Sequence, residues 1–170
     1  VLGEIKILVV CVNSPDTKDS SPEWSKEKIE DKISSNKHSL DAYWRACSVD
    51  NKTGESKVWL SVTILEGWRE MPRELSEYGY GSYEELNQSR KFREDMIELL
   101  DPEVDFSLYD GLIVFRAGKN WAYDWSSLGK VPLSTDEGEV EISASFLTEN
   151  DMEIENDYAA HETGHGFFSL

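Results

Sequence analysis

The sequence predicts an α/β domain in which helices back a twisted, mixed and partly parallel sheet. An almost uninterrupted β-branched run at residues 5–12 and a fully apolar run at residues 112–115 are typical of strands buried on both faces. Polar segments with helix-start signals separate the expected strands, and this alternation favours partly parallel pairing. The chain of 170 residues shows no repeat and no linker, so residues 1–170 are expected to form a single domain.

Two helices and a further strand are expected after the first strand. A short helix should follow Ser21 and Pro22, because serine caps a helix and proline suits its first turn. A second helix is expected over residues 39–47. Its large apolar residues should be buried, namely Leu40, Tyr43 and Trp44. Residues 57–64 alternate apolar and polar side chains, which predicts a strand half exposed to water.

An aromatic loop is expected to lead into a long helix in the middle of the chain. Residues 67–81 combine glycine, proline and aromatic residues, which predicts a loop. Residues 82–85 form a capping box, in which serine and a glutamate three positions later satisfy the first backbone N–H groups of a helix. That helix should end at Asp101, because Pro102 cannot continue it.

The last third of the chain is expected to contain a loop, a strand and a helix. Residues 117–137 read as a loop, and the alternation of residues 140–147 predicts an edge strand. A helix is then expected from about residue 156 to the C-terminus.

Composition and charge argue against several classes of protein. The 34 acidic residues outnumber the 17 basic ones and give a formal charge of −17, which disfavours a nucleic-acid partner because phosphate would be repelled. No apolar run approaches the ~18 residues of a membrane span. Aromatic residues make up 11% of the chain, with six tryptophans, which argues against a disordered acidic tail.

The cysteines and the start of the chain do not decide the cellular compartment of the protein. Cys11 ends an apolar run and reads equally well as a buried thiol or as the partner of Cys47 in one disulfide of an extracellular protein. The chain begins without a signal peptide. This indicates either an intracellular protein or a secreted one whose leader and pro-segment have been removed.

The residues that carry chemistry are His161, Glu162 and His165 near the C-terminus. Side chains four residues apart lie on one face of a helix, so both imidazoles can reach one zinc ion. Glu162 would take a proton from a zinc-bound water as that water attacks a peptide carbonyl. A bare His-Glu-x-x-His pattern also arises by chance, but two of the chain's three histidines fall in it; His38, in a polar segment, is expected to be a surface residue.

This motif and the elements before it resemble the M6 family of secreted zinc metallopeptidases, the immune inhibitor A group. Two further segments carry the resemblance, which spans the chain from residue 5 onward. Residues 62–80 contain Gly-Trp-x-x-Met-Pro and a following Tyr-Gly, and residues 104–115 contain Tyr-Asp-Gly before an apolar strand.

The resemblance implies the upper, N-terminal half of a zincin catalytic domain, in which the C-terminal helix is the active-site helix. His161 and His165 would then be zinc ligands and Glu162 the general base of a secreted endopeptidase. The third ligand would fall at position 171, and a C-terminal subdomain would complete the site, so this fragment alone is expected to be inactive. A zincin of another clan, whose third ligand is a later glutamate, and a non-catalytic zincin-like binding or structural module remain alternatives.

Two further sites are weaker expectations. In zincins an edge strand pairs with the extended peptide substrate, and residues 140–147 are expected to take that role. The residues assigned to substrate binding are Val140, Ile142 and Ala144. Acidic side chains before the last helix could hold calcium. The simpler interpretation is that they are exposed to solvent and are favourable near the N-terminus of that helix. They are Glu149, Asp151, Glu153, Glu155 and Asp157.

Overall fold

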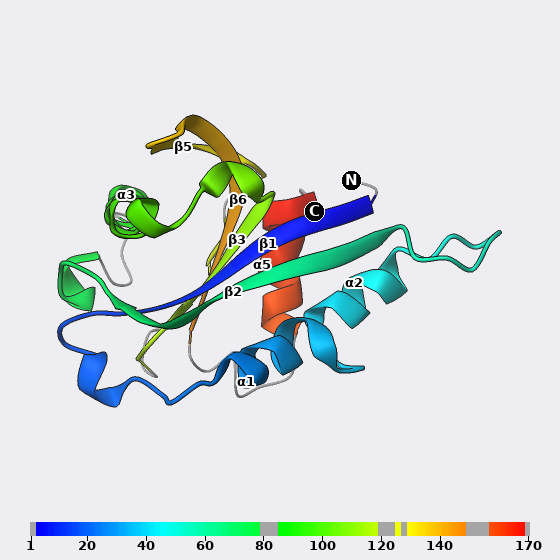
Figure 1. The fold of residues 1–170 in the computed structure, drawn as a ribbon, viewed down its shortest axis with the longest axis horizontal. Helices are drawn as coiled ribbons and strands as arrows, with labels where there is room; N and C mark the ends of the chain where they lie inside the picture. The colour runs from blue at the N-terminus through cyan, green and yellow to red at the C-terminus, as the bar shows by residue number, and fades with distance from the viewer. Residues whose placement is uncertain (1–2, 79–84, 119–124, 127–128, 149–156, 169–170) are drawn as a thin grey trace.

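The computed structural model describes residues 3–78, 85–118, 125–126, 129–148 and 157–168, and it confirms the mixed α/β fold (Figure 1). The sheet runs in the order β2-β1-β3-β6-β4, with β5 paired to β6 beside this path. Neighbours from β2 to β6 are parallel, whereas β4 and β5 are antiparallel to β6. The strands are β1 (Gly3–Asn13), β2 (Val58–Glu70), β3 (Gly111–Arg116), β4 (Trp125–Ser126), β5 (Val131–Thr135) and β6 (Gly138–Thr148).

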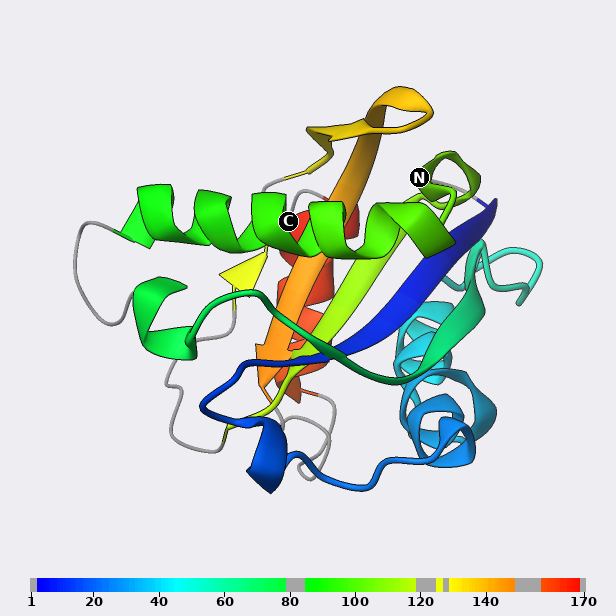
Figure 2. The ribbon, with the colours of Figure 1, turned by 60° about the vertical axis from the view of Figure 1, so that its left-hand side comes forward.

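Helices cover both faces of the sheet. Figure 2 shows α3 crossing the near face while α5 lies behind the strands, and α1 and α2 contribute to the same core as α5. The α-helices are α1 (Lys26–Glu30), α2 (Leu40–Cys47), α3 (Glu85–Leu100) and α5 (Asp157–Phe168). Single turns are η1 (Lys18–Ser20), the π-helical η2 (Asp31–Ser35), η3 (Leu75–Tyr78), η4 (Asp101–Glu103) and η5 (Phe106–Leu108).

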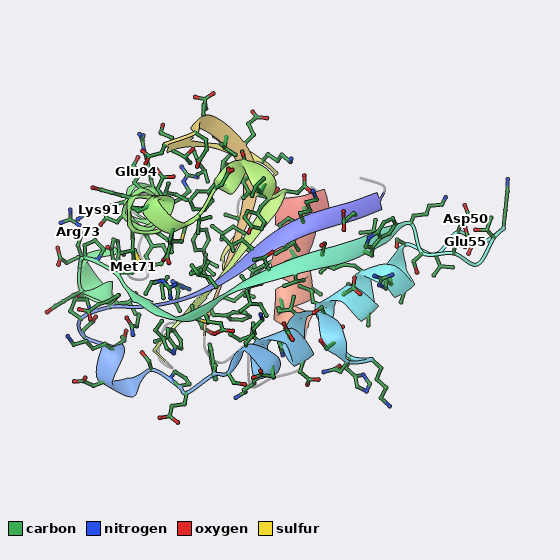
Figure 3. The ribbon with its side chains drawn as sticks, viewed as in Figure 1. Asp50, Glu55, Met71, Arg73, Lys91 and Glu94 are labelled. Atoms are coloured by element: carbon green, nitrogen blue, oxygen red, sulfur yellow. The ribbon has the colours of Figure 1, made fainter. Side chains whose placement is uncertain are left out.

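The central strands are buried on both faces, as their apolar runs predict. In β1, Ile7 and Val9 face the core that includes α1, α2 and α5, whereas Leu8 and Val10 face the core under α3. Successive side chains of a strand point to opposite faces, so a strand between two helical layers needs apolar residues at every position. Met71 also belongs to the core under α3 (Figure 3).

Serine caps set the starts of α1 and α2. Ser39 caps α2, its hydroxyl accepting a hydrogen bond from the Ala42 amide at 3.2 Å, as the sequence predicts. The first helix begins later than expected, at Lys26, because Ser25 and not Ser21 provides the cap. The prediction that Tyr43 is buried is wrong, since its side chain is 47% exposed on the outer side of α2.

The second strand is longer than the sequence predicts. β2 continues to Glu70, into the segment expected to be a loop. The pairing with β1 jumps from Val10 opposite Leu65 to Cys11 opposite Trp68, which leaves a bulge in β2. Gly67 has a φ of +81° at this point, a conformation that costs glycine little. The bulge therefore lets β2 stay paired with β1 although the alternation of apolar and polar residues along β2 ends here.

The prediction of an edge strand at residues 140–147 is wrong, and so is the prediction of a continuous loop over 117–137. That loop contains β4 and β5, and β5 returns through a tight turn into β6. β6 pairs with β3 on one side, and with β5 and then β4 on the other. Every residue from Ile142 to Thr148 is buried, because this part of the strand lies inside the sheet.

Candidate metal centre

The helix α5 exposes only its two histidines among residues 159–167. His161 is exposed and His165 half-buried, whereas the other seven residues of this stretch are buried. The buried side packs on the sheet through Ala159, Ala160 and Phe167, which belong to the core shared with β1 and β3. Because positions four apart share a helix face, this packing turns both imidazoles toward solvent together.

The two imidazoles lie next to each other, with their Nε2 atoms in contact. Their Nε2 atoms lie 3.1 Å apart, and the ring centroids are 4.5 Å apart with the planes at 86°. Two nitrogens bound to a tetrahedral zinc ion at 2.0–2.1 Å would be separated by ~3.3 Å. The separation of the His161 and His165 Nε2 atoms is close to this spacing, and it is also a hydrogen-bond distance for a pair in which one imidazole donates to the other.

A buried hydrogen bond holds the opposite side of α5. The Trp44 indole Nε1–H of α2 donates to the Thr163 hydroxyl at 3.1 Å, and that hydroxyl donates to the Ala159 carbonyl at 2.7 Å. Thr163 lies two residues from each histidine, which is ~200° around the helix. The Trp44 contact therefore faces the core when the histidines face out.

Glu162 lies beside the pair but on a less accessible side of the helix. Its side chain is only 8% exposed. A carboxylate next to the first histidine is in the sequence position to exchange a proton with a water held between the imidazoles. The helix thus carries two imidazoles and one carboxylate within five residues.

Other predicted groups do not join this pair. No group of three or more histidine, cysteine or acidic side chains comes together to hold a metal within the described part of the chain. His38 is exposed in the turn before α2, as expected. The acidic segment 149–156 lies outside the described residues, as does the side chain of Asp157.

The cysteines are free thiols in the structure. Cys11 is buried in β1 and Cys47 is exposed at the end of α2, so they form no disulfide. Burial raises the pKa of the Cys11 thiol to about 12, while the nearby charge of Arg69 lowers it by a smaller amount. Cys11 is therefore a neutral core residue and not a nucleophile.

The residues assigned to substrate binding lie where the sheet is already paired. Val140 and Ile142 stand opposite Leu133 and Val131 of β5. Ile142 and Ala144 are also almost completely buried, with exposed fractions of 0% and 1%. At Val140 and Ile142 a peptide could add to this side of β6 only by displacing β5, whereas Ala144 pairs with Leu112 of β3. Among the described strands, two form the edge on this side of the sheet: β5 beside residues 138–142 of β6, and β4 beside Ser145 and Phe146.

A groove that the sequence does not predict lies between α3 and β5. It has a volume of about 620 Å³, and Leu133 and Pro132 form its β5 side. Arg90 and Glu94 of α3 line it and form an ion pair with a separation of 2.7 Å. The groove is on the sheet face opposite α5, because α3 covers that face (Figure 2). The sequence does not predict this groove because β5, which forms one side of it, falls inside a segment predicted to be a loop.

Comparisons with known proteins leave the family of this chain open. No protein-family model matches it, and no curated protein matches its sequence. None of the described helices has the length and apolar character needed to cross a membrane.

Proposed function

We propose that this chain carries the active-site helix of a zinc-dependent endopeptidase of the M6 type. The observation that carries the proposal is the pair of Nε2 atoms 3.1 Å apart on the exposed strip of an otherwise buried helix. The pair lies on the side of α5 away from the sheet, so packing of the helix on the sheet does not require it. The neighbouring Glu162 supplies the acid–base group that hydrolysis requires.

Each residue then has a separate role. His161 and His165 hold the metal, and zinc, when bound, would polarise the peptide carbonyl and acidify a water molecule. Glu162 accepts the proton of that water and passes it to the leaving amine. The low exposure of Glu162 restricts competition from bulk water for this proton. We place the third ligand outside the described residues, in a C-terminal subdomain.

The substrate in this proposal is an extended protein or peptide. We place it along β4, since β5 already pairs with β6 at Val140 and Ile142, two of the three positions first expected to bind substrate. α5 lies next to this part of the sheet, as the Gly129 amide just before β5 donates to the His165 carbonyl at 3.3 Å. Secretion and a calcium site in the acidic segment before α5 belong to the same proposal.

The first test is the zinc content of the chain and of a form extended past Leu170. His161→Ala should abolish stoichiometric zinc, whereas His38→Ala, a matched substitution of an exposed histidine, should leave it unchanged. Glu162→Gln should retain zinc and lower peptide cleavage by the extended form by ~10²–10⁴-fold, the range expected for loss of a general base.

The opposite outcomes decide against the proposal. Absence of zinc from both forms would favour a non-catalytic zincin-like module. Zinc that remains after His161→Ala would place the metal elsewhere. Cleavage that survives Glu162→Gln at full rate would remove Glu162 from the mechanism.

A further inference from the structure

The C-terminal end of α5 packs into a space that exists only because position 111 is glycine. A Cβ atom built on Gly111 would lie 2.3 Å from Cε1 and 2.7 Å from Cζ of the Phe167 ring. Carbon atoms in ordinary contact are ~3.5 Å apart. Even one methyl group at this position would therefore overlap the ring by ~1 Å.

Neither side of this contact can easily give way. Gly111 begins β3, where it stands opposite Ile7 of β1 and Ser143 of β6, so its backbone is held from both sides. The Phe167 side chain is buried in the core that includes Ile113. A rigid ring packed in a core relieves an overlap chiefly by moving with its own backbone, because interiors hold little free space.

Moving that backbone would move the candidate ligands. Phe167 lies two residues after His165 on the same helix. Two described hydrogen bonds hold the helix nearby: the bond from Trp44 to Thr163 in the preceding turn, and the bond from the Gly129 amide to the His165 carbonyl. A change at Gly111 would thus shift the end of α5 relative to these contacts and carry the imidazoles away from their place above the sheet.

We infer that Gly111 is a positioning residue for the His161–His165 pair: by admitting the Phe167 ring it sets where the pair lies relative to the sheet. The inference rests on the proposed metal-binding function. It concerns the location of the bound metal and not the ability of the two imidazoles to bind it, since both imidazoles move with the helix.

The test locates cobalt, a paramagnetic substitute for zinc, by the pseudocontact shifts that it induces in sheet amide signals of the ¹⁵N-labelled chain. These shifts fall with the cube of the distance, so a ~1 Å displacement changes the shift of an amide ~12 Å away by about a quarter. Gly111→Ala should produce such changes in β3 and β6. The double variant Gly111→Ala/Phe167→Leu, which shortens the obstructing side chain, should restore the wild-type shifts.

Each outcome decides one question. Wild-type shifts in Gly111→Ala would overturn the inference while the metal site stands. Loss of the fold in Gly111→Ala that the second substitution does not repair would also overturn it, because the Phe167 ring would then not be the cause. Failure of cobalt to bind both the wild-type chain and its form extended past Leu170 would overturn the metal-binding function, and the inference with it.

Discussion

Replacing Thr163 by valine removes the acceptor of the Trp44 indole N–H and leaves the size of the side chain almost unchanged. Both residues are buried, with exposed fractions of 0% for Thr163 and 7% for Trp44, and the hydrogen bond is 3.1 Å long. Leaving a buried donor without its partner costs ~1–3 kcal/mol, more than the ~0.5–1.5 kcal/mol that the bond itself contributes. We therefore expect Thr163→Val to lower the free energy of unfolding by about 2 kcal/mol.

A double-mutant cycle separates this hydrogen bond from packing. Trp44→Phe removes the donor and some ring contacts, so its cost combines both effects. In the double variant Trp44→Phe/Thr163→Val neither a donor nor an acceptor is left. The double variant should thus be more stable than the sum of the single effects by ~1 kcal/mol.

The measurement is urea denaturation followed by far-UV circular dichroism, because tryptophan fluorescence would change with the substitution itself. Thr63→Val is the matched control, since Thr63 is exposed on β2, and its effect should stay within ~0.5 kcal/mol. If Thr163→Val costs no more than this control, or the two single effects simply add, the Trp44–Thr163 bond does not hold α5.

Three further predictions concern the rest of the chain. Asp41→Ala should cost ~2–3 kcal/mol in the same assay, because its carboxylate accepts a hydrogen bond from the Leu60 amide of β2 at 2.6 Å. Arg45→Met removes only the partly exposed ion pair with Asp41 and should cost less than ~1 kcal/mol. Equal costs of the two substitutions would contradict this prediction. A thiol reagent should label Cys47 and spare Cys11 in the native protein, and label both in urea; native labelling of Cys11 would show that it is accessible. Because burial raises the pKa of Cys11 from 9.0 to about 12, the unfolded chain loses this proton first, so stability should fall as the pH rises from about 9 to 12, by up to ~1.4 kcal/mol per pH unit. In Cys11→Ala that part of the pH dependence should disappear from urea titrations.

Much of the fold could be predicted from local sequence patterns. The apolar run of β1 predicts a strand buried on both faces, and Ser39 predicts the start of α2, because both signals depend on neighbours along the chain. The spacing of His161 and His165 likewise places the two imidazoles on one helix face. These properties follow from the residue periods of helices and strands alone, and those periods can be read directly from the sequence.

The pairing partners of each strand could not be predicted from such local patterns. β6 alternates in its first residues like an edge strand, yet it lies between β3 and β5, and nothing within β6 itself identifies the strands that flank it. β5 contains Pro132, which lowers its resemblance to a strand, although an edge position tolerates the missing N–H. The choice of Val140, Ile142 and Ala144 as substrate residues rested on the prediction that β6 is the edge strand.

The sequence by itself determined that two imidazoles and a carboxylate share five residues of a helix, because that spacing needs only the geometry of one turn. Only the tertiary structure decided which way that helix faces. Trp44 and Gly111 come from segments more than 50 residues away in the chain, and they contact Thr163 and Phe167 because the sheet brings α2, β3 and α5 together. Such contacts have no local period, so the residues that orient the site cannot be identified before the strands are placed.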